Sequence, residues 1–169
     1  MKKITLKPKR DYSVRRHHPW IFSGAVLDGE AESGETVEVR SSGGECLGYG
    51  SYSPSSQIRV RMLSFDSSAK VDESYIESLV ASSIGRRADF FADAYTNAVR
   101  LVNAESDSLP GVVVDYYAGW AVCQLTSAGA ERWKEAIVSA VMSAVLPVVT
   151  LNQVVLKRFV LTSVIHSLI

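Results

Sequence analysis

Long uncharged apolar runs are missing from this 169-residue sequence, and none is long enough to cross a bilayer. The N-terminal residues MKKITLKPKR also lack the apolar core of a secretory signal peptide. We therefore expect a cytoplasmic protein with no membrane partner.

Cysteine is scarce, and this scarcity limits the chemistry available to the chain. The two cysteines, Cys46 and Cys123, lie far apart and form no CxxC or Cys/His pattern, so neither a disulfide framework nor a zinc site is indicated. We expect both thiols to be reduced and buried. His17 and His18 have no cysteine or third histidine nearby in the sequence, so we expect no bound metal.

The formal net charge is zero, but the charge is unevenly distributed. Residues 1–20 hold seven lysines and arginines against one aspartate, whereas residues 21–150 hold nine basic and seventeen acidic residues. A basic arm beside an acidic body suggests an anionic partner bound at one end.

Short alternating apolar runs characterise the first seventy residues. Residues 35–40, 46–50 and 57–63 read as strands, separated by Ser-Gly-Gly and Ser-Pro-Ser turns. This pattern predicts a small antiparallel β-barrel or sandwich, in which Arg59 and Arg61 share one surface.

Helical spacing begins after a polar linker at residues 64–70. The apolar spacing predicts a helix from Glu73 to about Ala94, capped by Asp72. Three strands should follow, and then a helix that starts near Ser127 or Gly129 and ends at Pro147. The strands are expected at residues 100–103, 112–116 and 120–125.

The predicted fold class is thus a mainly β N-terminal barrel followed by a small α+β domain. The corresponding domain ranges are residues 1–70 and 71–150, and residues 151–169 form an apolar tail.

The segment from Arg15 to Gly24 combines cationic and aromatic side chains around Pro19. Guanidinium groups bind phosphates, and exposed aromatic rings stack on unpaired bases, so the segment is a candidate for RNA binding. The alternative is that the aromatic residues anchor the core and the cations form only a solvated edge.

Evidence for a catalytic or cofactor site is weak. Glu105, Asp107 and Asp115 gather near a Leu-Pro-Gly turn, where carboxylates more often cap backbone amides than act as acids and bases. The segment Gly48–Gly50 is too short for a dinucleotide loop and lacks a following helix.

Three segments resemble the RlmI-like family of large-subunit (23S) rRNA cytosine-C5 methyltransferases. They are RRHHPWIFSGAV at residues 15–26, GYGSYSPSSQIRVR at residues 48–61 and RLVNAESDSLPGVVVDYYAGWAVCQLTSAG at residues 100–129. The first two look like the family's N-terminal PUA domain, a β-barrel that binds RNA. The third looks like the family's central α/β domain.

The resemblance implies RNA-binding roles for basic, aromatic and hydroxyl residues of the barrel. It places Arg15, Arg16, His17 and Trp20 at the RNA-facing entrance and Ser53–Ser55 in an adjoining loop. With the other cations of the barrel, the predicted RNA-binding residues are Lys9, Arg10, Arg15, Arg16, His17, Trp20, Ser53, Ser55, Arg59 and Arg61.

In that family, a further domain binds S-adenosylmethionine and carries a nucleophilic cysteine. Neither Cys46 nor Cys123 matches the nucleophile, and we assign no catalytic, cofactor-binding or metal-binding residue. We expect a truncated, RNA-binding part of the methyltransferase that binds large-subunit rRNA and is inactive alone. The alternative is a protein-interaction domain or a relic fragment that does not bind RNA.

The resemblance fails after Pro147, where the sequence becomes apolar. One interpretation is that a frameshift or truncation replaced the downstream half. The other is that residues 151–169 form a final strand and helix that complete the core of the central domain.

Overall fold

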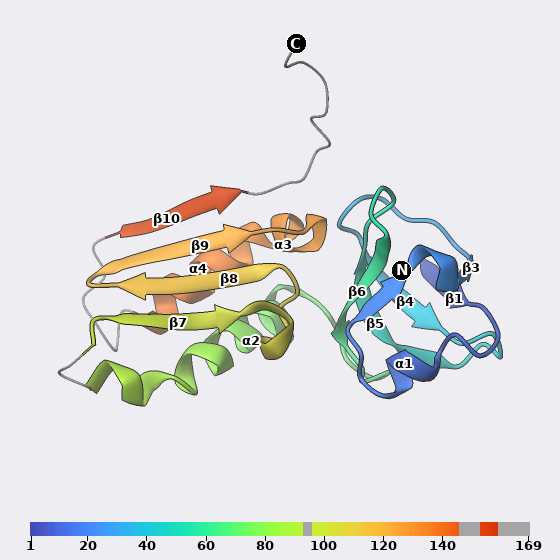
Figure 1. Ribbon diagram of the computed structural model, residues 1–169, viewed down its shortest axis with the longest axis horizontal. Helices are drawn as coiled ribbons and strands as arrows, with labels where there is room; N and C mark the ends of the chain where they lie inside the picture. Colours follow the sequence, from blue (N-terminus) through green and yellow to red (C-terminus); the bar gives the residue numbers. More distant parts are fainter. Residues whose placement is uncertain (93–95, 146–152, 159–169) are drawn as a thin grey trace, which may run out of the picture.

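The computed structural model describes residues 1–92, 96–145 and 153–158, which form two sheets in succession along the chain (Figure 1). The first sheet has six strands in the order β2-β6-β5-β4-β1-β3, and the second has four in the order β10-β9-β8-β7. A mainly β N-terminal part followed by an α+β part is therefore confirmed. No helix in the described ranges is long and apolar enough to cross a membrane.

The first sheet curls around its own apolar core. Most neighbouring strands pair antiparallel, but β1 and β4 pair in parallel. The elements of this part are β1 (Lys3–Leu6), α1 (Tyr12–Arg15), β2 (Trp20–Phe22), the 3-10 turn η1 (Ser23–Ala25), β3 (Val26–Asp28), β4 (Thr36–Arg40), β5 (Cys46–Tyr52) and β6 (Ile58–Ser64).

Alternation along the strands builds the barrel core. Val37 and Val39 of β4 are fully buried, while their neighbours on the strand are only partly buried, as period-2 spacing requires. Gly48 has a φ of 126°, and a Cβ there would lie 2.1 Å from the carbonyl oxygen of Ser64 on β6. This glycine therefore allows β5 and β6 to approach each other closely.

In the second part, two helices are packed against a four-stranded sheet. The helices α2 and α4 contact each other, and their buried residues share one core with β7, β8 and β9. The elements are α2 (Glu73–Gly85), η2 (Ala88–Ala92), β7 (Ala98–Asn103), η3 (Ala104–Asp107), β8 (Val112–Tyr117), β9 (Trp120–Leu125), α3 (Ala128–Arg132), α4 (Lys134–Val145) and β10 (Gln153–Arg158).

The cap predicted at Asp72 and the helix start predicted near Ser127 are confirmed. The Asp72 side chain accepts a hydrogen bond from the Tyr75 amide at the start of α2. The Ser127 hydroxyl accepts one from the Ala130 amide at the start of α3.

The predicted helix lengths need correction. The helix expected to continue to Ala94 ends as an α-helix at Gly85 and gives way to the 3-10 turn η2, in keeping with the weak helix propensity of glycine. The helix expected after Ser127 is divided at Trp133 into α3 and α4.

Part of the apolar tail completes the second sheet. Strand β10 pairs in parallel with β9, with Gln153 opposite Trp120 and Arg158 opposite Leu125. The expectation of a final strand is therefore confirmed. The helix expected after it lies outside the described residues.

Candidate nucleic-acid interface

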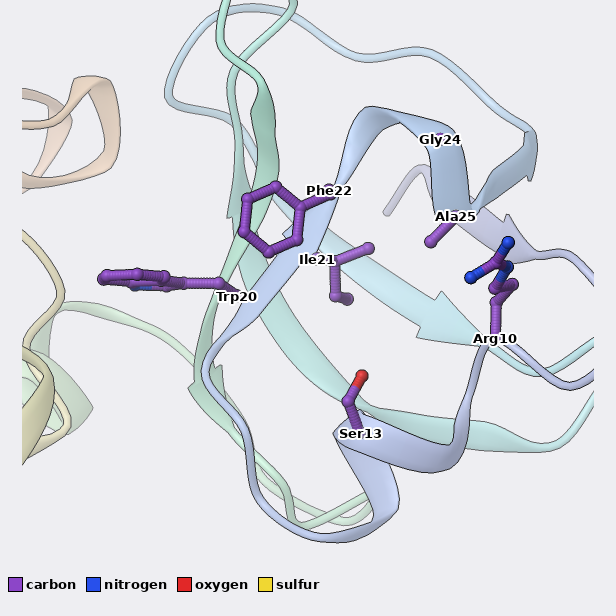
Figure 2. A pocket seen from close by; sticks show the side chains of 7 residues that line it. All are labelled: Arg10, Ser13, Trp20, Ile21, Phe22, Gly24 and Ala25. Carbon is purple, nitrogen blue, oxygen red and sulfur yellow. The ribbon is translucent and has the colours of Figure 1, made fainter.

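A hollow of about 260 Å³ lies between the turn that leads into α1 and strand β2 (Figure 2). It combines a guanidinium group, a hydroxyl group and aromatic rings. Its lining residues are Arg10, Ser13, Trp20, Ile21, Phe22, Gly24 and Ala25.

The alternation of β2 separates core residues from surface residues in this hollow. Ile21 is buried in the barrel core, whereas Trp20 and Phe22 are 37% and 50% exposed. β2 is an edge strand that pairs with β6 in the described sheet, so its aromatic side chains border solvent. Ile21 is thus the core anchor, and the faces of the two neighbouring rings are partly open to solvent, although the Trp20 indole also donates to Glu105.

Three basic side chains without a carboxylate partner lie before and after α1, and one of them, Arg10, lines this hollow. Lys9 and Arg10 belong to the exposed turn between β1 and α1, and Lys9 has a φ of 65°. Arg16 follows α1, donates to the Tyr12 hydroxyl at 2.6 Å and lies 5.5 Å from the centre of that ring. In the part of the chain that the structure describes, none of these three cations forms an ion pair, so they are available to an anion.

Arg15 has a different role, because it is engaged within the barrel. Its guanidinium forms ion pairs with Asp11, one helical turn earlier, and with Glu45 in the turn between β4 and β5. Hydrogen bonds from Arg15 lower the pKa of both carboxyl groups, while the pKa of Arg15 itself is raised. Arg15 therefore links α1 to the turn between β4 and β5.

His17 lies on the side of the barrel where Arg15 meets Glu45. The imidazole stacks on Phe65 with a centroid distance of 4.7 Å and an interplanar angle of 18°. Its backbone adopts a φ of 59°, which directs the chain from α1 toward β2.

The described residues contain no group of three or more histidine, cysteine, aspartate or glutamate side chains suited to a metal.

The remaining predicted residues form another group, around the turn between β5 and β6. Arg59 donates to the carbonyl oxygens of Ser53 and Pro54 and lies over the Tyr52 ring at 5.9 Å. Arg59 therefore holds the loop in place. Arg61 does not hold this loop. It lines a separate hollow, which Ser53 also lines.

The predicted residues thus occupy several regions of the barrel. The hollow by β2 also contains Phe22, which the family resemblance did not indicate. The alternation of Trp20, Ile21 and Phe22 in the sequence places Phe22 on the same face as Trp20 and is the signal that identifies it.

The clustered acids of the second part have structural roles. The Asp107 carboxylate is 4% exposed, pairs with Arg86 and Arg87, and accepts the Asn103 amide at 2.6 Å. Burial opposes its ionisation, but these hydrogen bonds outweigh burial and lower its pKa.

The capping role expected for these acids is confirmed for Asp107, which bonds a backbone amide. Asp115 instead forms a two-pronged ion pair with Arg100 on the neighbouring strand β7. Neither carboxylate is placed as a free acid or base.

The two free cysteines differ in their surroundings. Cys123 is fully buried in β9, and burial raises the pKa of its thiol to about 12. The expectation of burial is wrong for Cys46, which starts strand β5 and is only partly buried. A thiol with the pKa of Cys123 is a poor nucleophile at neutral pH.

The glycine pair in β5 does not form a cofactor cradle. Gly48 and Gly50 are hydrogen-bonded in the middle of the barrel sheet, and the chain continues from them into another strand. A loop for S-adenosylmethionine needs backbone amides that open toward the ligand at the start of a helix. These residues do not fit that cofactor.

The barrel matches a known domain family. Residues 4–65 match the PUA-like domain. This range begins in β1, includes the β2 hollow and ends just after β6.

Curated relatives share sequence over most of this chain. It is 42% identical over 139 residues to the ribosomal RNA large subunit methyltransferase I of Shewanella frigidimarina and 44% identical over 140 residues to that of Alteromonas mediterranea. These alignments cover 80% and 82% of this chain. The chain spans about 35% of the length of each relative.

Solved structures share the fold. A putative SAM-dependent methyltransferase from Streptococcus mutans superimposes with a TM-score of 0.80 at 20% identity, over 94% of this chain and 41% of its own. A putative methyltransferase complexed with SAH gives the same TM-score and covers 40% of its own chain. At this level of identity, the similarity shows a common fold.

Proposed function

Since this chain is similar over most of its length to ribosomal RNA large subunit methyltransferase I and its barrel matches the PUA-like domain, we propose that it is an RNA-binding module. Its partner is large-subunit rRNA, and it works in the cytoplasm. The hollow between α1 and β2 is the principal contact.

One observation carries the proposal: unpaired cations lie beside exposed aromatic rings on an edge strand. Arg10 lines the same hollow as Phe22, and Lys9 precedes Arg10 in the same turn. A guanidinium binds a phosphate through two hydrogen bonds, and an exposed ring stacks on an unpaired base. The combination suits a looped or single-stranded RNA segment better than a regular duplex.

Four of the predicted RNA-binding residues do not line this hollow. Arg15 and Arg59 are engaged within the barrel, where they hold α1 and the loop at Ser53–Ser55. Arg16 adds a cation at the end of α1, where it contacts Tyr12, and His17 fixes the path of the chain between α1 and β2.

We assign no step of methyl transfer to the residues that the structure describes. Cys123 is buried, Asp107 and Asp115 are ion-paired, and the glycine pair lies within a strand. In our proposal, the described residues bind RNA and leave the chemistry to other residues.

Fluorescence anisotropy with a labelled fragment of large-subunit rRNA tests this proposal. The double variant Arg10→Gln with Phe22→Leu removes one cation and one exposed ring from the hollow. Loss of a stacked base and a phosphate contact should reduce the affinity at least tenfold, because stacking alone contributes about 1–3 kcal/mol per base.

The matched control is Lys70→Gln with Phe90→Leu, which removes the same charge and an exposed ring elsewhere. Its affinity should stay within about twofold of the wild type, as expected for surface changes outside the contact. Equal affinities for the wild type and the hollow variant would contradict the proposal. Absence of binding would favour a protein-interaction domain.

A further inference from the structure

A second hollow, of about 280 Å³, lies between the barrel and the second sheet. The barrel contributes Ser33, Ser53, Ser55 and Arg61, and the turn between β9 and α3 contributes Thr126 and Ser127. Its polar lining consists of hydroxyl groups and one guanidinium, and no carboxylate is present among the described residues that line it.

Arg61 lies half-buried in this wall without an ion-pair partner in the described ranges. Within the described residues, its guanidinium donates only one hydrogen bond, a long one of 3.4 Å, to the carbonyl oxygen of Ile58. Burial lowers its pKa, and the nearby Glu105 acts in the opposite direction without reaching ion-pair distance. A guanidinium remains charged in such a place, so an anion that enters the hollow would gain a strong partner.

Serine hydroxyls line the same hollow as this cation. Ser53 is 7% exposed, and within the described part of the chain its hydroxyl has no hydrogen-bond partner. Ser33 and Ser55 likewise have no side-chain partner in the described residues. The Ser53 side chain is largely buried but opens onto the hollow, so its hydroxyl can donate to a ligand that accepts hydrogen bonds.

Side-chain hydrogen bonds hold the opposite wall in place. The Ser127 hydroxyl donates to the Pro110 carbonyl oxygen and caps α3, while the Thr126 hydroxyl donates to the Gly111 carbonyl oxygen. The two walls also meet closely, because a Cβ on Gly129 of α3 would lie 2.2 Å from the Ser51 hydroxyl of β5. The hollow is therefore formed before any ligand binds.

We propose that this hollow binds one phosphate group, held by the Arg61 guanidinium and the hydroxyls of Ser53 and Ser55. The inference rests on the proposed function in one respect, namely that the RNA backbone supplies the phosphate. A phosphate held between the barrel and the second sheet allows both parts to position the RNA together.

Inorganic phosphate is the first probe, because it tests the site without RNA. Titration of the ¹⁵N-labelled protein should shift the amide signals of Ser53, Ser55 and Thr126 in a saturable way. Chloride at the same ionic strength should not shift them.

RNA binding to variants tests the source of the phosphate. Arg61→Gln should weaken binding about three- to tenfold and reduce the salt slope by about one, as expected for loss of one phosphate contact. Ser53→Ala, a milder change that guards against misfolding, should weaken binding about twofold or more. Ser42→Ala in the exposed turn before β5 is the matched control and should bind as the wild type does.

The outcomes separate this inference from the proposed function. If the wild type binds RNA, but both variants bind equally well and phosphate shifts no amide in the hollow, the phosphate site is wrong and the RNA-binding proposal stands. If phosphate shifts those amides but the wild type binds no RNA, the site is supported as one for free phosphate and RNA is excluded as its source. If neither occurs, both proposals fail.

Discussion

The indole Nε1 of Trp20 donates a hydrogen bond of 2.9 Å to the Glu105 carboxylate, although 85 residues separate the two in sequence. This bond joins the barrel to the second part of the chain, and Figure 2 shows the Trp20 ring extending from β2 away from Arg10. Across the sheet, Trp20 lies opposite Arg61. The ring expected to stack on RNA therefore also connects the two parts beside the proposed phosphate hollow.

Removal of this hydrogen bond should lower stability. Trp20→Phe keeps an aromatic ring but loses the donor, and we expect the free energy of unfolding to fall by about 1 kcal/mol, the contribution of one partly exposed hydrogen bond. Urea denaturation measures the change. Trp120→Phe on the exposed surface of β9 is the control, and equal losses for both variants would contradict a connecting role for Trp20.

A methyl group at Gly129 should separate the barrel from α3. Gly129→Ala would place its Cβ 2.2 Å from the Ser51 hydroxyl, closer than real Cβ contacts allow. We expect the thermal midpoint to fall by several degrees, in line with a cost of about 1–3 kcal/mol for overpacking.

Gly85→Ala is the matched control, because nothing lies within 4 Å of its Cβ position. Since alanine has the higher helix propensity, this variant should be neutral or slightly stabilising. If the two variants have the same thermal midpoint, α3 and the barrel are not packed closely at Gly129.

Asp107 should make stability depend on acid pH. Its pKa in the folded state is below the ordinary value near 3.8, so its contribution is complete above that value and is lost as the pH falls toward the folded pKa. Asp107→Asn leaves Arg86 and Arg87 without their carboxylate, and we expect a loss of about 2–3 kcal/mol at pH 7.

Chemical denaturation at pH 7 and pH 3 measures this effect. The difference between the wild type and Asp107→Asn should shrink at pH 3, because below the ordinary pKa near 3.8 the carboxyl group binds a proton in the unfolded wild type more readily than in the folded one. A difference that is the same at both pH values would show that the ion pairs do not act through ionisation.

The two thiols should react at very different rates. Because burial raises the pKa of Cys123 to about 12, a thiol reagent at pH 8 should modify it only after unfolding. Cys46 is partly exposed and should react in the folded protein. The Cys46→Ser variant should then show no fast-reacting thiol, and fast labelling of that variant would contradict the burial of Cys123.

Features that depend on local sequence could be predicted. Period-2 spacing located the strands around Val37 and Val39, and the capping residues Asp72 and Ser127 marked the starts of helices. Both patterns arise from residues close together in the chain, so they require no knowledge of distant contacts.

Features that depend on distant partners could not be predicted. The strands before residue 35 are short and pair with later segments, as β1 does with β4. The pairing of Arg15 with Glu45 spans 30 residues, and only the fold shows that this arginine is engaged while Arg10 is not. The hollow at Arg61 likewise exists only once β9 and α3 meet the barrel.

The central claim is that this chain binds RNA through phosphate contacts, and the dependence of binding on salt tests it most directly. We expect the wild type to bind a large-subunit rRNA fragment, with a slope of about −3 in a plot of log K against log salt concentration. That value corresponds to about four phosphate contacts, one each for Lys9, Arg10, Arg16 and Arg61. No binding at low salt, or binding that salt leaves unchanged, would contradict the claim.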